Sequence, residues 1–352
     1  MNRRTFHTLA LGAGASVFSQ APTLSGAAGG GKPIRAGQIG TKHAHASGQL
    51  EMLRACADYE VVGVVEPDEE LRKKAEKDKA YAGVTWMTEE QLLNTPGLQL
   101  VSVETGVGDL LNTAEKVVNA GMHLHLDKPA GESLEQFKRI LDTTTAKKRL
   151  VKMGYMFRYN SGFDLAVKAV REGWLGDISV IHAEMSKFMD DEGRAAMLPY
   201  KGGSMFELGC HVIDSVVRIL GKPEKVSPHI QRGKDGWADN MLAVLDYPKA
   251  TATVRSSMIE VQGGARRQFV VCGNMGTVEI LQLDAPTVRL MLDRPRGEYK
   301  KGIQTVKVPN LPRYAADWVD FAKAIRGEKA WEFTPEHDLA VQETVLRASG
   351  MM

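Results

Sequence analysis

The sequence predicts an α/β protein: a Rossmann-like doubly wound parallel sheet followed by an α+β domain with a large, mostly antiparallel sheet. Two patterns and the length support this class. Short apolar segments alternate with amphipathic helical segments in the first part of the chain, whereas several strands follow one another without helices in the second part. The 352 residues are enough for two domains that each bury a core.

Residues 32–150 carry the alternating pattern and predict a dinucleotide-binding domain. One helical segment ends at Gly121, and another begins at Ser133, a residue type that caps helix N-termini. Strands that alternate with helices in this way form a parallel sheet with crossover helices. The predicted strands are 34–40, 60–66, 98–104, 122–127 and 149–155, and the predicted helices are 68–80, 109–121 and 133–148.

Residues 151–310 predict a domain for substrate binding and oligomerisation. Helices are expected over 163–172 and 204–220, with a polar loop at 189–203. The consecutive strands predict a sheet with one face on the helices and the other available to a second subunit, as a homodimer or homotetramer. These strands are 178–185, 238–247, 250–260, 267–273, 276–283 and 287–293. Residues 311–352 are expected to form helices that pack back on the body.

Residues 1–31 resemble a twin-arginine export signal. Arg3 and Arg4 precede a short apolar segment rich in Gly and Ala, and a tail of small residues follows. The apolar segment is too short to remain as a membrane span. We therefore expect a periplasmic protein, exported folded, with no membrane span after removal of the signal. The alternative is a disordered tail that contains two arginines by chance.

The composition excludes several classes of function. Hydrophobic residues make up 43% and charged residues 25%, as in ordinary globular proteins. Without Arg3 and Arg4, 43 Lys and Arg residues balance 43 Asp and Glu residues, so no basic patch predicts nucleic-acid binding. The three cysteines are too widely separated for a disulfide framework or a structural zinc site.

The turn after the first strand is where a dinucleotide would bind. The GxGxxG fingerprint needs glycine at three positions, but only Gly40 fits, and Lys42 and His45 occupy the other two. A side chain at the second position crowds the pyrophosphate unless Lys42 pairs with a phosphate. His43 and His45 suggest a metal, but His-x-His at the start of a helix is expected to splay the two rings apart. We therefore predict no metal.

Glu66 ends the second predicted strand and favours a nucleotide. An acid at this place accepts hydrogen bonds from ribose hydroxyls and repels a 2′-phosphate, which predicts NAD, with NADP as the alternative cofactor. The competing interpretation is a solvated carboxylate at a strand end. The predicted cofactor-binding residues are Gly40, Thr41, Lys42, His43, Glu66, Glu104, Thr105 and Lys128.

Three residues are candidates for catalysis. Lys128 follows a predicted strand, where open α/β sheets bind ligands, and can polarise a substrate oxygen. His211 can act as general base or acid, and Glu207, four residues earlier on the same helix face, can orient or share its proton. Alternatively, Ser204 and Glu207 form a capping box. Glycine inside a helix, as at Gly209, destabilises it by about 1 kcal/mol relative to Ala. A ligand or strand that approaches too closely for a side chain would explain why glycine is present there.

These residues, with the domain layout, resemble the Gfo/Idh/MocA oxidoreductases from about residue 34 to the C-terminus. Asp127-Lys128-Pro129 is similar to the family's Glu-Lys-Pro motif. Its Gly-Gly…Asp-x-Gly-x-His-x-x-Asp helix is similar to a segment in which Glu207 replaces the first aspartate. That segment is Gly202-Gly203…Glu207-x-Gly209-x-His211-x-x-Asp214, and residues 270–280 and 314–328 also resemble the family.

The resemblance implies a nicotinamide cofactor, a sugar or polyol substrate, and Lys128 and His211 as the catalytic pair with Glu207 beside them. It also implies substrate contacts from the segment that follows the Rossmann domain. A plainer interpretation of Asp214 is a pair with Arg218 on the same helix. The predicted substrate-binding residues are Tyr155, Arg158, Tyr159 and Asn160, with His182, Glu184 and Asp214 as further candidates.

Three functions remain open on the sequence. The first is an NAD(P)-dependent oxidoreductase that moves hydride between a sugar, sugar derivative or cyclitol and a tightly held nicotinamide. The second is an NAD-dependent glycosidase, lyase or epimerase that oxidises its substrate transiently. The third, favoured by Lys42, is a non-catalytic sugar-binding protein with a decayed cofactor loop.

Overall fold

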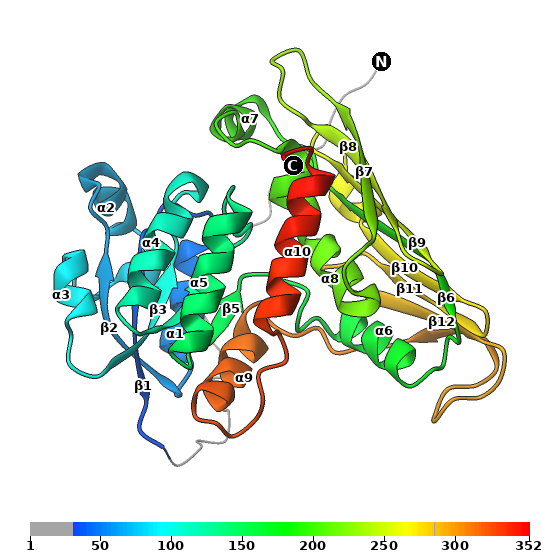
Figure 1. Cartoon of the computed structure of the whole chain (residues 1–352), viewed down its shortest axis with the longest axis horizontal. Helices are drawn as coiled ribbons and strands as arrows, with labels where there is room; N and C mark the ends of the chain where they lie inside the picture. Colours follow the sequence, from blue (N-terminus) through cyan, green and yellow to red (C-terminus); the bar gives the residue numbers. More distant parts are fainter. Residues whose placement is uncertain (1–30, 285) are drawn as a thin grey trace, which may run out of the picture.

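The computed structural model describes residues 31–284 and 286–352, which form two lobes with a long C-terminal helix between them (Figure 1). The predicted export signal lies outside these residues, apart from Gly31. Within the described ranges, no helix is both long and apolar enough to cross a membrane.

The first lobe contains a five-stranded parallel sheet in the order β2-β1-β3-β4-β5, which confirms the predicted doubly wound sheet. The strands are apolar because helices cover the sheet. Since β2 and β3 lie on opposite sides of β1, the strand order reverses there and leaves a crevice at the carboxyl ends. The strands are β1 (Ile34–Ile39), β2 (Tyr59–Val65), β3 (Leu98–Val103), β4 (His123–Leu126) and β5 (Val151–Met153).

The helices predicted over 109–121 and 133–148 are present, and a helix of no stated range was expected after the His-x-His segment and is found there, but two other segments differ from the prediction. The segment predicted as one helix over 68–80 ends at Ala75 and resumes as a single 3₁₀ turn, Lys79–Tyr81. The five-residue α3, which begins with a Thr88–Gln91 capping box, was not predicted because it is too short to show periodicity. The helices are α1 (Ala46–Ala55), α2 (Glu69–Ala75), α3 (Glu89–Leu93), α4 (Val107–Asn119) and α5 (Leu134–Ala146).

The second lobe contains an eight-stranded sheet in the order β13-β12-β11-β10-β6-β9-β8-β7. Only β6 and β9 are parallel neighbours, so the sheet is mostly antiparallel, as predicted. Helices α6 (Ser161–Arg171) and α8 (Cys210–Leu220) belong to this lobe, and α8 contacts β6 and β9. The strands are β6 (Ile178–Ser186), β7 (Lys225–Gln231), β8 (Asn240–Asp246), β9 (Thr251–Ser257), β10 (Gln268–Gly273), β11 (Gly276–Leu281), β12 (Thr287–Leu292) and β13 (Gly302–Val306).

The two edge strands, β7 and β13, were not predicted. Neither contains a buried residue, so neither shows the alternation of buried and exposed side chains that marks the inner strands. Pro228 lies within β7, where an edge position tolerates its missing N–H. The predicted polar loop also contains a short helix, α7 (Asp191–Met197), none of whose residues is buried.

The C-terminal helices α9 (Ala315–Ile325) and α10 (Pro335–Ala348) pack on the rest of the molecule. Trp318 and Phe321 of α9 belong to an apolar cluster with Ile34 of β1. Helix α10 contacts α5 of the first lobe and α8 of the second, and Figure 1 shows it between them. The Gln342 side chain accepts a hydrogen bond from Ala130 N at 3.3 Å and donates to Gly131 O at 2.6 Å. Helix α10 therefore supports the loop that follows β4.

Candidate active site

The carboxyl ends of the first-lobe strands meet at one edge and form a cleft of about 970 Å³. Gly40 follows β1, Glu66 follows β2, and Thr105 lies just beyond β3, so three strand ends contribute to its lining. This is the edge at which open α/β sheets bind ligands. Lys42 and Gly106 also line the cleft.

Gly40 makes the first turn possible. Its φ is +92°, and a Cβ at this position would lie 2.6 Å from Thr105 N. Any side chain would therefore push β1 away from the end of β3.

Glu66 anchors the same turn. Its Oε2 accepts hydrogen bonds from Thr41 N and Thr41 Oγ1, both at 2.8 Å, and its Oε1 accepts from Asp68 N at 3.1 Å. The interpretation as a merely solvated carboxylate is therefore wrong. Because a carboxylate has about four acceptor positions, Glu66 can still accept from a ribose hydroxyl.

Lys42 does not fill the cleft. It is exposed, and its Cδ would lie 3.1 Å from a Cβ added at Gly106, so its stem runs along the cleft wall. The buried Thr105 Oγ1 in the same wall has no hydrogen-bond partner among the described atoms. The Lys42 ammonium and the Thr105 hydroxyl are suited to the phosphates of a dinucleotide, and the Glu66 carboxylate is suited to its ribose.

Lys128 reaches across from the first lobe to Glu207 in the second. Its Nζ lies 3.1 Å from Glu207 Oε1 and donates to Glu207 O at 2.8 Å, and its side chain is only 2% exposed. Glu207 lies in a π-helical turn, Met205–Gly209, that precedes α8. Single π-helical turns of this kind occur frequently at functional sites.

The predicted capping box at this turn is not formed. Ser204 Oγ donates to Ser256 O in β9 at 2.9 Å and does not cap the helix. Glu207 is therefore free to pair with Lys128. A Cβ added to Gly209 would lie 2.6 Å from Met205 Sδ and 3.3 Å from Ser256 Cβ, so the close approach expected at this glycine involves a strand.

His211, at the start of α8, lies between the lobes. Its ring centre is 6.5 Å from that of His45 in the first lobe and 6.2 Å from that of Tyr155. Met156 N lies 3.4 Å from His211 Nδ1, the length of a long hydrogen bond, which helps to fix the ring.

Lys128 and His211 favour opposite protonation states. Burial opposes the charge on Lys128, but the Glu207 carboxylate overcomes this effect and raises the pKa of the lysine above its ordinary value. Burial, assisted by the positive charge of Lys128, lowers the pKa of His211 well below its ordinary value. At neutral pH the site therefore presents a fixed ammonium ion and a neutral imidazole that can accept a proton.

The rings of His43 and His45 are not splayed apart, so that expectation is wrong. Their centres lie 4.9 Å apart, and both Nδ1 atoms face the Asp127 carboxylate, at 3.0 and 3.1 Å. Asp127, at the end of β4, is fully buried and draws both rings to one point. Asp127 was not among the predicted site residues, although it precedes Lys128.

Glu104 lies behind this cluster and does not line the cleft. Its side chain is 0% exposed, and its Oε1 accepts a hydrogen bond from Ser102 Oγ at 2.9 Å. Burial and the neighbouring Asp127 raise the pKa of Glu104 well above its ordinary value. The side chain is therefore not placed for the predicted contact with the cofactor, and the backbone carbonyl of Glu104 accepts a hydrogen bond from His43 N at 3.0 Å.

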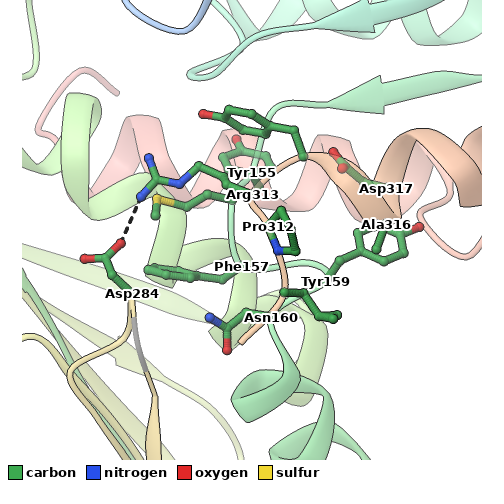
Figure 2. Close-up of a pocket in the computed structure, with 12 residues that line it drawn as sticks. Tyr155, Phe157, Tyr159, Asn160, Asp284, Pro312, Arg313, Ala316 and Asp317 are labelled. Atoms are coloured by element: carbon green, nitrogen blue, oxygen red, sulfur yellow. Dashed lines mark hydrogen bonds and ion pairs between the residues drawn. The ribbon is translucent and has the colours of Figure 1, made fainter. Parts of the chain in front are cut away.

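Tyr155, Tyr159 and Asn160 line a small pocket of about 50 Å³ (Figure 2), which approaches the predicted catalytic residues through Tyr155, whose ring centre lies 6.2 Å from that of His211. Tyr159 donates its hydroxyl to Asp320 at 2.6 Å, and Asn160 caps α6. Arg313, which was not among the predicted site residues, also lines the pocket and pairs with Asp284 at 3.0 Å. No motif marks Arg313, because its segment is brought here only by the packing of α9.

Arg158 and Asp214 form a buried ion pair that does not line the pocket. Arg158 Nη2 lies 2.7 Å from Asp214 Oδ1 and 2.5 Å from Asp338 Oδ1, and all three side chains are at most 2% exposed. Both residues were predicted to contact the substrate, but here they form an ion pair inside the protein. Asp214 does not pair with Arg218, which instead contacts Asp164 and Glu332.

His182 and Glu184 are not brought to Lys128 either. Ile181 and Ala183 belong to the core, so the residues that alternate with them in β6 face the other side of the sheet. There His182 Nδ1 lies 2.7 Å from Thr253 Oγ1, and Glu184 pairs with Arg255 at 2.7 Å.

Comparisons with known proteins agree with this architecture. Residues 34–155 match the oxidoreductase family with an NAD-binding Rossmann fold, and residues 163–279 match the GFO/IDH/MocA C-terminal domain. The scyllo-inositol 2-dehydrogenase (NADP(+)) IolW of Bacillus subtilis is 25% identical over 276 residues, covering 72% of this chain and 76% of that protein. The trans-1,2-dihydrobenzene-1,2-diol dehydrogenase of Bos taurus is 25% identical over 255 residues, covering 70% and 72%.

Solved structures show the same fold. The aldose-aldose oxidoreductase from Caulobacter crescentus, complexed with glycerol, aligns with a TM-score of 0.76 and 17% identity, covering 91% of this chain and 98% of that one. The UDP-N-acetylglucosamine 3-dehydrogenase GnnA from Acidithiobacillus ferrooxidans aligns with a TM-score of 0.74 and 17% identity, covering 91% and 98%.

Proposed function

The chain belongs to the Gfo/Idh/MocA family of NAD(P)-dependent oxidoreductases, and from this premise we propose that it oxidises or reduces a secondary hydroxyl of a sugar, sugar derivative or cyclitol. The names of its relatives, an inositol dehydrogenase, a dihydrodiol dehydrogenase and an aldose-aldose oxidoreductase, support a hydroxylated ring as substrate. No observation in the site favours the transient-oxidation or the non-catalytic alternative.

The observation that carries the proposal is that a charged Lys128 and a neutral His211 both lie where the two lobes meet. The nicotinamide, when bound, supplies hydride acceptance and donation. His211 takes the proton of the reacting hydroxyl, and the Lys128 ammonium stabilises the negative charge that develops on the same oxygen. Glu207 keeps Lys128 charged and directed into the site.

We propose NAD as the preferred cofactor because of Glu66. Its carboxylate is fixed by Thr41 at the end of β2, where a 2′-phosphate would bring further negative charge to an acid that is only 9% exposed. The printed name of IolW specifies NADP, so the two nucleotides need a direct comparison.

We further propose a periplasmic location, because Arg3 and Arg4 begin a segment with the features of a twin-arginine signal. A periplasmic enzyme has no free nicotinamide pool, so the cofactor is held through turnover. We propose assembly as a dimer or tetramer through the face of the eight-stranded sheet that carries His182 and Glu184.

Cofactor release tests the proposal. The purified protein is denatured, and the supernatant is assayed for NAD and NADP; one equivalent of NAD per chain is expected. Adding sugars and cyclitols to the native protein should then change the absorbance of the bound nicotinamide. Lys128→Met should keep the nucleotide and lose this change, whereas Lys138→Met, which removes an exposed lysine, should retain both. Protein that neither contains nor binds either nucleotide would refute the proposal.

A further inference from the structure

The cluster formed by His43, His45 and Asp127 has no role in the proposed hydride transfer. Each of the three residues offers a ligand atom, and these atoms lie within 4.8 Å of one another. Asp127 is fully buried, whereas the side chain of His45 is 19% exposed and the side chain of His43 7%. The cluster is therefore closed to solvent at Asp127 and partly open to solvent at His45.

The hydrogen bonds of His43 leave its Nδ1 atom without a proton in the neutral ring. Its Nε2 lies 3.1 Å from the Lys128 carbonyl oxygen, which can only accept, so Nε2 carries the hydrogen. His45 N donates to Nδ1 at 3.3 Å, which also requires a lone pair there. Yet Nδ1 lies 3.0 Å from Asp127 Oδ2, another atom with lone pairs. A cation between these two atoms, either a proton or a metal ion, resolves the conflict.

A further buried carboxylate is directed at the cluster. Glu104 Oε2 has no hydrogen-bond partner among the described atoms, lies in a side chain that is 0% exposed, and is 4.0 Å from His43 Nδ1. Burial and Asp127 raise the pKa of Glu104, so a proton on this carboxyl can bond to Asp127, and a bound cation would offer the same oxygen an alternative partner.

We propose that His43, His45 and Asp127 bind a divalent transition-metal ion, of the zinc or cobalt type, with Glu104 as the nearest further carboxylate. Imidazole and carboxylate donors suit these ions. Bonds of about 2.0 Å in a tetrahedral site separate neighbouring ligand atoms by about 3.3 Å. The observed separations between the imidazole nitrogens and the Asp127 oxygens are 3.0 to 3.2 Å, close to this value, and all three ligand atoms lie within 4.8 Å of one another.

The second contact of His43 follows the usual pattern of a metal ligand. Ligating histidines donate their other ring N–H to a carbonyl or carboxylate, which fixes the tautomer and the ring. Here the acceptor is the carbonyl oxygen of Lys128. An ion at this position would link the nucleotide turn to the catalytic lysine and add positive charge near His211, whose ring centre lies 6.5 Å from that of His45.

Metal titration of tag-free protein, previously treated with a chelator and dialysed, tests the inference. Zn²⁺ content is measured by elemental analysis, and Co²⁺ is followed by its visible absorption. One equivalent per chain and the intense bands of low-coordinate Co²⁺ are expected. The variant is His45→Gln, because His45 is partly exposed and makes no side-chain cap to α1, so the fold should tolerate the change. It should weaken binding by about tenfold or more.

The matched control is His182→Gln, which alters a histidine on the outer face of the second sheet and should leave metal affinity unchanged. Equal binding by both variants and the unaltered protein would mean adventitious surface binding and overturn the inference. So would the absence of binding, or nitrogen chemical shifts showing that His43 remains an imidazolium ion with metal present. Nicotinamide release from the same samples is measured separately, so failure here is distinguishable from failure of the proposed oxidoreductase.

Discussion

The Lys128 ammonium lies 3.1 Å from the Glu207 carboxylate and 2.8 Å from the carbonyl oxygen of the same residue. One side chain of the first lobe thus contacts both the charge and the backbone of a π-helical turn in the second. The carboxylate keeps the lysine charged, and the carbonyl fixes its direction.

Replacing Lys128 by Met should reduce kcat/KM by about 100-fold or more, because a charge that stabilises the developing oxyanion is removed. The melting temperature should also fall, since Glu207 loses its partner. Glu207→Gln keeps the backbone carbonyl contact and should reduce kcat/KM less. Steady-state kinetics and thermal melting measure both effects. If Glu207→Gln is as inactive as Lys128→Met, the carboxylate takes a direct part in the chemistry.

Asp214→Asn should destabilise the fold by about 2–3 kcal/mol, because Arg158 keeps Asp338 but loses the second carboxylate of a fully buried ion pair. Urea denaturation measures the change. Asp164→Asn removes a partly exposed carboxylate beside Arg218 and should cost less than about 1 kcal/mol. A raised KM with unchanged stability in Asp214→Asn would restore its role as a substrate contact.

Gly40→Ala should weaken dinucleotide binding and destabilise the first lobe. The alanine would have to keep the positive φ of Gly40, and its Cβ would lie 2.6 Å from Thr105 N. Gly83→Ala is the control, because Gly83 has φ +71° and no atom within 4 Å of an added Cβ. It carries only the backbone cost of about 1–2 kcal/mol. Thermal melting and nucleotide titration compare the two, and equal effects would show that the turn can move away from β3.

The free energy of unfolding should decrease as the pH falls from 7 to 5, partly because of His123. Burial, and to a lesser extent Arg149, lowers its pKa to about 4, and its Nδ1 accepts a hydrogen bond from Leu150 N at 3.0 Å. An unfolded histidine has a pKa of about 6.5, so below this pH the unfolded state binds more protons. The contribution of His123 is present above pH 6.5 and is lost as the pH falls towards 4.

Between pH 7 and pH 5, His123 should account for about 2 kcal/mol of this decrease. His123→Gln removes the titrating group and should reduce the pH dependence by that amount in urea unfolding. Burial also lowers the pKa values of His125 and His211, so part of the pH dependence of the free energy of unfolding should remain in His123→Gln. An unaltered slope in His123→Gln would show that this ring is solvated.

The sequence predicts the elements whose residues are buried in a regular pattern. The inner strands of both sheets are apolar or alternate, and they lie where predicted. Edge strands β7 and β13 have no buried face, so their sequences contain no such signal. The helix over 204–220 is present, but it begins with a π-helical turn, before which Ser204 donates a hydrogen bond to Ser256 of β9, and no local sequence pattern encodes that contact.

The candidate site is predictable where a residue's position along an element fixes its direction. Lys128 follows a strand and His211 begins a helix, and both face the other lobe. Arg158 and Asp214 were predicted to bind substrate because their shared partner in the buried ion pair, Asp338, is remote in the sequence. The approach of His43 and His45 to Asp127 was missed for the same reason, since Asp127 follows β4 and is remote from both histidines in the sequence.

The hydrogen bonds from Gln342 to the loop after Lys128 have a consequence for protein synthesis. The ribosome must release α10 before that loop is fixed, although the first lobe has been translated long before. A C-terminally clipped polypeptide should therefore keep the contact of Lys128 with Glu207 and lose the support of the loop beyond it.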